Sequence, residues 1–188
     1  LDFLATVTGS SLVSGDRAHH GRGGLDSPVH PFWSSNQEVF PRRMNLRFVL
    51  VRPRNPLNIG AAARAMANFG FSDLAVVKPF APVWRETTSA PGAEKLVQDA
   101  RVFSSIDQAI ADCHLVVGTT ALRNRRPERP VVSLPRLMDY LNNEAPSPFL
   151  SKENGTFQAA LLFGPEKTGL SGPYLERCHF WITIPTVV

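Results

Sequence analysis

The stretch LRFVLVRPRNPLNIGAAARAMANFG (residues 46–70) combines the two patterns that determine the fold. Residues 46–52 form a short apolar run that the breakers of PRNP close, which predicts a buried strand. Residues 58–69 carry apolar side chains at helical spacing, with Asn58 as a good N-cap and Gly70 as a stop, which predicts a helix. A buried strand joined directly to such a helix is typical of an α/β domain.

The same alternation continues toward the C-terminus. Apolar runs predict further strands in DLAVVKP (73–79), HLVVGTT (114–120), FQAALLFG (157–164) and HFWITIP (179–185). Helices are expected near 93–100, after Ser105, from Ser133 and around 171–177. Short apolar strands alternating with helices predict an α/β fold with a mostly parallel sheet and helices on both faces. Ligands bind such sheets beyond the carboxyl ends of the strands, so the segments of interest are RPRNPLNIG (52–60), GTTALRNRR (118–126), GPEKTG (164–169) and IPTVV (184–188).

Composition narrows the class of protein. The chain has 188 residues, enough for one ordinary domain, and its 43% hydrophobic and 19% charged residues exclude a chain that is disordered throughout. Cys113 and Cys178 are too few for a disulfide framework and lack metal-ligand spacing, so no metal is expected. No apolar run approaches the roughly 18 residues of a membrane span. We therefore expect a cytoplasmic protein without membrane contact.

Residues 1–43 differ from the rest of the chain. They are rich in Gly, Ser and Pro, and four arginines balance four acidic residues, so the net charge of +4 lies entirely in residues 44–188. The first methionine, Met44, directly precedes the first strand. We expect 1–43 to be a disordered leader or upstream extension and 44–188 to be the folded domain. The acidic residues argue against an organelle transit peptide.

The predicted helix 58–69 carries Gly60 and Arg64 four residues apart on one helix face. Gly60 lets another backbone or a ligand approach closely, and Arg64 offers a fixed-charge fork to a phosphate or carboxylate. A lone arginine on a helix is, however, more often a solvated or paired surface residue. The position just after a strand favours the functional interpretation, because the first turn of such a helix is open to an anion.

GPEKTGLS (164–171) places a charged loop between Gly164 and Gly169, directly after an apolar strand. Glu166 either caps backbone amides or binds a ligand amine, and the alternative is an ordinary turn between a strand and a helix. The loop is no P-loop, because Leu170 stands where lysine is required. No GxGxxG motif for a dinucleotide is present either.

Arginines gather after two of the predicted strands. They indicate contacts with the phosphates of a nucleic acid, while the structural alternative is a solvated loop. The candidates are Arg52 and Arg54 after the first strand, and Arg123, Arg125, Arg126 and Arg129 in LRNRRPERP. His114 and His179 both begin strands, where we expect them to pack or cap rather than catalyse.

The order NIGAAARAMANFG, LVVGTTA, LLFGPEKTGL and HFWITIP resembles the SpoU (TrmH) branch of the SPOUT class of RNA methyltransferases over residues 46–185. The opening RPRNPLNIG is similar to that of bacterial tRNA 2′-O-methyltransferases that modify the anticodon loop. The resemblance implies methyl transfer from S-adenosylmethionine to a ribose 2′-hydroxyl of tRNA, or alternatively of rRNA. It also implies a homodimer and a C-terminal trefoil knot, a rare exception to the usual rules of chain topology.

The resemblance assigns roles to residues that match the family's motifs. Arg64 corresponds to the catalytic arginine, which the family supplies from the partner subunit. Asn58 and Gly60 belong to the first motif, and Glu166 and Gly169 to the second. The residues assigned to the cofactor pocket are Thr119, Thr120, Ala121, Gly164, Ile184 and Pro185.

The third motif departs from the family pattern. It normally continues into a Ser-Leu-Asn run and a final helix that complete the knot, whereas this sequence stops at IPTVV (184–188). We expect either a truncated chain or a protein that does not close the site as its relatives do. The alternative to an enzyme is therefore a non-catalytic RNA-binding module with the same fold. An enzyme with another nucleotide cofactor is disfavoured, because phosphate-binding motifs are missing.

Overall fold

A computed structural model describes residues 44–80, 84–122, 126–145 and 156–185, so the expected leader 1–43 lies outside the described residues. In this part of the chain a seven-stranded sheet has the order β3-β2-β1-β6-β4-β7-β5. All of its strand pairs are parallel, which confirms the predicted α/β class. The strands are β1 (Met44–Val51), β2 (Asp73–Val77), β3 (Arg101–Phe103), β4 (Leu115–Thr119), β5 (Val131–Ser133), β6 (Phe157–Phe163) and β7 (Phe180–Thr183).

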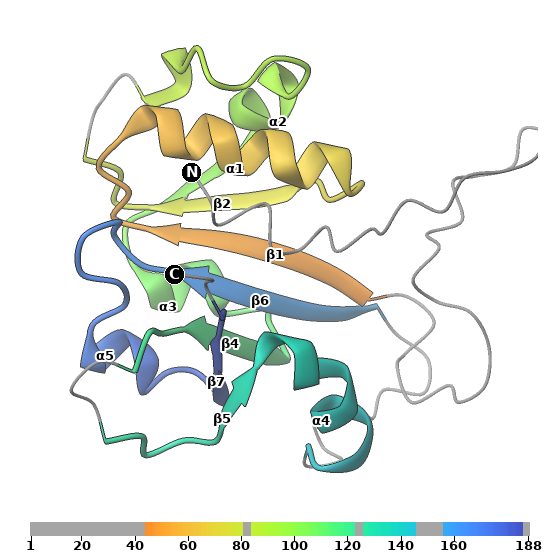
Figure 1. The fold of residues 1–188 in the computed structure, drawn as a ribbon. Helices are drawn as coiled ribbons and strands as arrows, with labels where there is room; N and C mark the ends of the chain where they lie inside the picture. Colours follow the sequence, from red (N-terminus) through yellow and green to blue (C-terminus); the bar gives the residue numbers. More distant parts are fainter. Residues whose placement is uncertain (1–43, 81–83, 123–125, 146–155, 186–188) are drawn as a thin grey trace, which may run out of the picture. The chain divides into compact units, whose positions relative to one another are not determined.

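Helices cover both faces of the sheet (Figure 1). They are α1 (Pro56–Asn68), α2 (Glu94–Asp99), α3 (Ile106–Ile110), α4 (Leu137–Asn143) and α5 (Gly172–Leu175), with 3-10 turns η2 (Trp84–Glu86) and η3 (Leu134–Arg136). Alternate residues of β1 point to opposite faces, as strand geometry requires. Phe48 and Leu50 pack with α1 and α2, whereas Val49 and Val51 pack in the core that contains residues of α3 and α5. A third apolar cluster holds α4 over β4, β7 and β5.

Helix α1 begins two residues earlier than the sequence predicts, and its N-cap lies three residues earlier. Its N-cap is Asn55, whose side chain accepts a hydrogen bond from the backbone N–H of Leu57 at 3.0 Å, so the assignment of Asn58 as N-cap is wrong. Pro56 explains the difference, because proline is favoured in the first helical turn, where its missing N–H costs nothing. The predicted stop is confirmed, since Gly70 follows the C-cap with a left-handed φ of +74°.

Two short strands were not predicted. β3 and β5 have three residues each, too few for a recognisable apolar pattern. The helical segment predicted from Ser133 is confirmed: Ser133 ends β5 and is the N-cap residue of η3, which leads directly into α4. The predicted cap at Ser105 is confirmed, because its hydroxyl accepts a hydrogen bond from the N–H of Gln108 at 3.2 Å.

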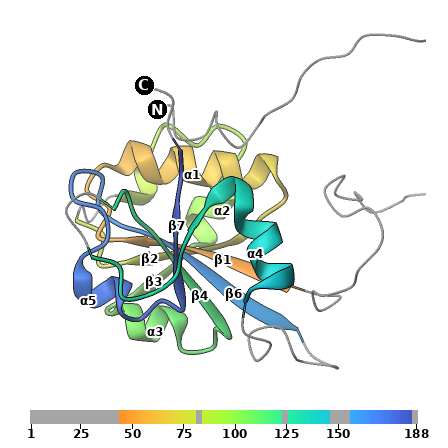
Figure 2. The same cartoon turned by 60° about the horizontal axis from the view of Figure 1, so that its bottom comes forward.

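Strand β7 lies between β4 and β5, although it follows both in sequence. Phe180 pairs with Val117 on one side, and Trp181 pairs with Val131 on the other. The connection from 120 to 130 therefore joins two strands that have a later strand between them (Figure 2). This arrangement brings the C-terminal segment next to the end of β4.

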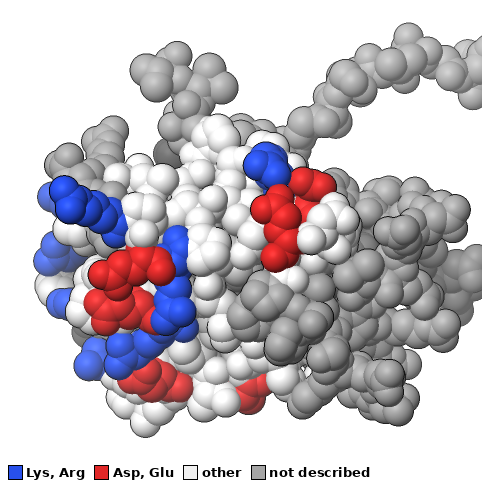
Figure 3. Space-filling model, turned by 90° about the horizontal axis from the view of Figure 1, so that it is seen from below, with Lys and Arg blue, Asp and Glu red and all other residues white. Residues whose placement is uncertain are grey.

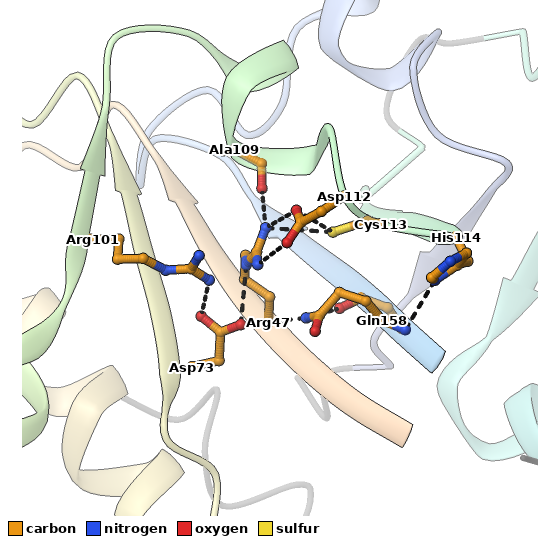
Figure 4. A network of polar contacts seen from close by, with 9 residues as sticks. Arg47, Asp73, Arg101, Ala109, Asp112, Cys113, His114 and Gln158 are labelled. Carbon is orange, nitrogen blue, oxygen red and sulfur yellow. Dashed lines mark hydrogen bonds and ion pairs between the residues drawn. The ribbon is translucent and has the colours of Figure 1, made fainter. Parts of the chain in front are cut away.

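The amino edge of the sheet is held by a buried arginine (Figure 4). Arg47 in β1 is only 2% exposed and donates two hydrogen bonds to the carboxylate of Asp112, at 2.6 and 2.7 Å. It also donates to Asp73 at 3.1 Å and to the carbonyl of Ala109 at 2.6 Å. Asp73 in turn accepts a hydrogen bond from Arg101 at 2.6 Å. One guanidinium thus joins β1 to β2 and to the turn between α3 and β4, with its charge fully paired, as a buried charge requires.

We predict that Asp112→Asn lowers the free energy of unfolding at neutral pH. This free energy should also decrease less in the variant than in the wild type as the pH falls. The hydrogen bond from Arg47 lowers the pKa of Asp112 to about 2 from an ordinary value near 3.8. Because folding lowers this pKa, the ionised carboxylate stabilises the fold above about pH 4, and the contribution is lost as the pH falls toward about 2. The variant should lose about 1–2 kcal/mol at pH 7, the low end for a charge-assisted bond, because the Asp112 side chain is 60% exposed.

Urea unfolding between pH 7 and pH 3 measures this difference. Asp99→Asn is the matched control, since Asp99 is 63% exposed and pairs only with Lys95 across one helix turn. Parallel pH curves for the wild type and Asp112→Asn would contradict the assignment.

Candidate functional site at the carboxyl edge of the sheet

The segments that follow β1, β6, β4 and β7 lie side by side, because these four strands are consecutive in the sheet. α1 leaves β1 on one face, while α5 follows β6 on the opposite face (Figure 1). In parallel sheets whose helices leave neighbouring strands on opposite faces, the carboxyl edge is the usual ligand site. The residues that follow the four strands at this edge are 52–55, 164–170, 119–122 and 184–185.

Glu166 connects the segment after β6 to the segment after β1. Its carboxylate accepts hydrogen bonds from the backbone N–H groups of Arg54 at 3.2 Å and Asn55 at 3.1 Å, and from the side-chain amide of Asn58 at 3.0 Å. Of the two roles that the sequence allows, the structure therefore places Glu166 as a cap of backbone amides. Partial burial raises the pKa of Glu166, but these hydrogen bonds outweigh it, and the net pKa lies below its ordinary value.

The loop between Gly164 and Leu170 folds tightly on itself. A Cβ atom on Gly164 would lie 2.1 Å from the carbonyl carbon of Gly169 and 2.2 Å from the nitrogen of Leu170, so only glycine fits there. Gly169 has a left-handed φ of +64° and donates its N–H to the carbonyl of Pro165 at 2.8 Å. Both glycines are thus required by the shape of the loop that presents Glu166.

Residues 119–121 are fixed between the ends of β6 and β7. The hydroxyl of Thr119 donates to the carbonyl of Leu162 at 2.9 Å, and the N–H of Thr120 donates to the carbonyl of Ile182 at 2.9 Å. Ala121, next along the chain, is exposed. These residues therefore border the same part of the edge as Gly164, which directly follows β6.

The C-terminal side of this group is formed by Ile184, which is half-buried, and Pro185, which is exposed. All six cofactor candidates consequently sit at the ends of three adjacent strands. They offer apolar side chains, hydroxyls and backbone groups without charge, which fits a nucleoside-like ligand better than a phosphate or metal ion. Among the residues that the structure describes, no group of three or more His, Cys, Asp or Glu side chains could hold a metal ion.

Gly60 and Arg64 face different surroundings, although both lie on α1. A Cβ atom on Gly60 would lie 2.2 Å from the Ser89 hydroxyl and 2.7 Å from that of Thr87. The close approach that Gly60 permits is therefore made by the chain's own segment 87–89. Arg64 is exposed, and in the described part of the chain its side chain makes no hydrogen bond or ion pair.

The candidate RNA-binding arginines fall into two groups. Arg52 and Arg54 are exposed at the end of β1, while Arg126 and Arg129 are exposed in the connection between β4 and β5. The remaining candidates, Arg123 and Arg125, lie outside the described residues. Seen from below, cationic and anionic side chains are interspersed rather than sorted into one basic face (Figure 3).

Histidine and cysteine take structural roles in the described chain. Nδ1 of His179 accepts the N–H of Val116 at 2.8 Å, and Nδ1 of His114 accepts the N–H of Gln158 at 3.1 Å, so both histidines cap strand amides. Burial lowers the pKa of His179. Burial also raises the thiol pKa of Cys113 to about 11 and that of Cys178 to about 12, which keeps both protonated and poorly nucleophilic.

The segment after β2 was not among the sites expected from the sequence. Lys78 and Phe80 stand at the same edge as Arg52 and Arg54, and both are exposed. A lysine and a phenylalanine within three residues of a strand end form no distinctive sequence pattern.

Comparison with known proteins shows the family to which the chain is related. The SpoU rRNA Methylase family matches residues 45–188. Over 142 residues the chain is 37% identical to the tRNA (cytidine/uridine/adenosine-2′-O-)-methyltransferase TrmJ of Pseudomonas aeruginosa, covering 75% of this chain and 52% of that protein. The chain thus spans about half the length of this curated relative.

Solved structures with the same fold are similar over a comparable range. A methylase family protein from Haemophilus influenzae superimposes with a TM-score of 0.62 at 33% identity, covering 77% of this chain and 57% of that one. TrmJ from Z. mobilis superimposes with a TM-score of 0.59 at 34% identity, covering 75% and 59%.

We predict that Gly164→Ala destabilises the protein by about 1–3 kcal/mol, the usual effect of overpacking, because its Cβ would displace backbone. Gly172→Ala is the control, since the nearest atom to its Cβ is 4.0 Å away, and it should be nearly neutral. Denaturant unfolding of both variants measures the difference, and equal effects would refute the packing argument.

Proposed function

Because the chain belongs to the SpoU methylase family, we propose that it transfers a methyl group from S-adenosylmethionine to a ribose 2′-hydroxyl of RNA. The observation that carries the proposal is the convergence of four motif segments at one edge of the sheet, where Glu166 joins the first motif to the second. We favour tRNA over rRNA as substrate, because relatives such as that of P. aeruginosa are named tRNA methyltransferases.

The cofactor would be held by the ends of β6, β4 and β7, where Gly164, Thr119, Thr120, Ala121, Ile184 and Pro185 gather. When bound there, S-adenosylmethionine supplies a methyl group on a positively charged sulfur, which is already a good leaving group. The chain therefore has to position the ribose and manage its proton, and the chemistry requires no metal ion. Apolar side chains at this position also keep water from the methyl group.

Arg64 is the residue that we assign to the ribose. A guanidinium is a poor base because its ordinary pKa exceeds 12. It is suited instead to orient the ribose or a neighbouring phosphate and to stabilise the negative charge that develops on the attacking oxygen. Its exposure on α1 supports action on a second copy of the chain, so we propose a homodimer in which each Arg64 serves the partner's site.

The position of β7 supports a C-terminal knot. β7 passes between β4 and β5, which the connection 120–130 joins. We propose that the chain after β7 continues through this connection, as the family resemblance implies. The C-terminal side of the cofactor pocket would then be shaped by the knotted segment.

The candidate RNA-binding arginines would contact RNA phosphates, since they are positively charged and those that the structure describes are exposed. Arg52 and Arg54 would serve one end of the site, and Arg123, Arg125, Arg126 and Arg129 the other.

In the described part of the chain, no helix is both long and apolar enough to cross a bilayer. We propose that the protein works in the cytoplasm, together with the tRNA that it modifies.

Labelled methyl transfer tests the proposed function. The protein is incubated with methyl-labelled S-adenosylmethionine and unmodified tRNA or rRNA, and the RNA is digested to nucleosides. Label in a 2′-O-methylated nucleoside supports the proposal. Label on a base contradicts it, and RNA binding without transfer identifies the chain as a non-catalytic RNA-binding module.

We predict that Arg64→Ala lowers single-turnover methyl transfer by about 100-fold or more, the scale for losing one positioned donor. Affinity for S-adenosylmethionine and melting temperature should barely change, because the exposed side chain has no partner within the described chain. Arg136→Ala is the control, since Arg136 is 66% exposed and pairs with Asp139 and Glu144 on α4 and beside it. Wild-type turnover by Arg64→Ala would remove Arg64 from the site.

A further inference from the structure

Phe80 is the most exposed large apolar side chain among the described residues, with 72% of its surface accessible. It follows β2 at the carboxyl edge. Its backbone N–H donates to the carbonyl of Pro53 at 3.1 Å, which fastens it to the segment between β1 and α1. A ring so exposed adds little to the core, yet its backbone is fixed beside the candidate site.

One cation lies against this ring, and two more follow the ends of β1 and β2. The guanidinium carbon of Arg54 lies 5.4 Å from the ring centre, within the range of a cation–π contact. Arg52 and Lys78 occupy equivalent positions, each directly after its strand, because Val51 pairs with Val77. All three cationic side chains are exposed, and none forms an ion pair within the described part of the chain.

The backbone after both strands turns sharply at these cations. Arg52 and Lys78 have left-handed φ values of +50° and +48°, which non-glycine residues rarely adopt. Each is held by a backbone hydrogen bond, from Arg52 to Val77 at 2.7 Å and from Lys78 to Phe103 at 3.1 Å. The two cations are thus held on strand ends rather than carried on a long loop.

An acidic residue that lies next to this group in the described part of the chain, Glu166, is already engaged. The carboxylate of Glu166 accepts hydrogen bonds from the backbone N–H groups of Arg54 and Asn55 and from the side-chain amide of Asn58. The three positive charges of Arg52, Arg54 and Lys78 therefore exceed the single negative charge of Glu166. An exposed ring beside excess positive charge matches the binding mode of single-stranded nucleic acid, in which a base stacks on the ring and cations meet the phosphates.

We propose that Phe80 is a stacking platform for an unpaired base of the RNA, with Arg52, Arg54 and Lys78 at the flanking phosphates. This inference rests on the proposed function. β2 and β6 are separated by β1 alone, so the strand that leads to the platform and the strand that leads to Gly164 lie two strand spacings, about 10 Å, apart. The stacked base consequently belongs to a nucleotide beside the methylated one.

The test compares Phe80→Ala, Phe80→Trp and the control Phe69→Ala. Phe69 is 40% exposed and caps the opposite end of α1. Binding is measured by fluorescence anisotropy with a labelled oligoadenylate and with unmodified tRNA, at several salt concentrations. Phe80→Ala should weaken binding about tenfold or more, the scale of one base–aromatic stack, and Phe80→Trp should restore it. The slope of log K against log salt should stay unchanged, because no charge is removed.

Companion measurements separate the alternatives. Melting temperature and S-adenosylmethionine affinity of Phe80→Ala should equal those of the wild type. Wild-type RNA affinity in Phe80→Ala, with methyl transfer intact in the wild type, overturns the platform but leaves the proposed function standing. If the wild type neither binds nor methylates RNA, both the stacking platform and the proposed function are wrong. A change in oligomeric state by light scattering, without loss of RNA affinity, shows a contact between copies and overturns the platform.

Discussion

The carboxylate of Glu166 makes the contact on which the candidate site depends. It accepts hydrogen bonds from two backbone amides and one side-chain amide in the segment that leads from β1 into α1. Bonds to an ionised acceptor are roughly twice as strong as neutral ones, so this carboxylate can hold the loop after β6 against the start of α1. The same contact fixes the start of α1, the helix that carries Arg64. The compact turn that Gly164 and Gly169 permit serves to deliver this one side chain.

The two edges of the sheet have different roles: the amino edge stabilises the fold and the carboxyl edge carries the candidate site. At the amino edge Arg47 joins β1, β2 and the turn before β4, and its charge is satisfied by Asp112 and Asp73. At the carboxyl edge β1 is followed by the exposed Arg52 and Arg54, whereas uncharged residues directly follow or end β6, β4 and β7. β1 contributes to both, since it begins beside the paired guanidinium and ends at Arg52. A rigid sheet anchored at one edge gives the loops of the other edge fixed positions, which methyl transfer between two bound molecules requires.

Much of this fold is predictable from apolar runs. The longer strands, the parallel arrangement and the caps at Ser105 and Gly70 follow from local patterns. The N-cap of α1 was misplaced because Asn55 and Asn58 are both suitable residues and Pro56 decides between them. The order β1-β6-β4-β7 could not be derived from periodicity, because each pairing joins segments far apart in sequence. Yet this order brings the motifs together. Glu166 could be named as a candidate from the sequence. The amides that donate hydrogen bonds to it could not, because they come near it only through the pairing of β1 with β6. Phe80 was overlooked because one phenylalanine after a strand has no distinctive pattern.

If the carboxylate of Glu166 holds the first and second motifs as one site, its removal should free the backbone amides that donate to it. Hydrogen exchange of the Arg54 and Asn55 amides measures this in the wild type and in Glu166→Ala. Alanine removes both carboxylate oxygens, whereas glutamine would keep a carbonyl oxygen that could accept from both N–H groups. Both amides should exchange about tenfold faster or more in Glu166→Ala, the factor for losing roughly 1.4 kcal/mol of hydrogen bonding, and methyl transfer should fall in the same variant. Unchanged exchange at both amides would show that the carboxylate does not hold the segment.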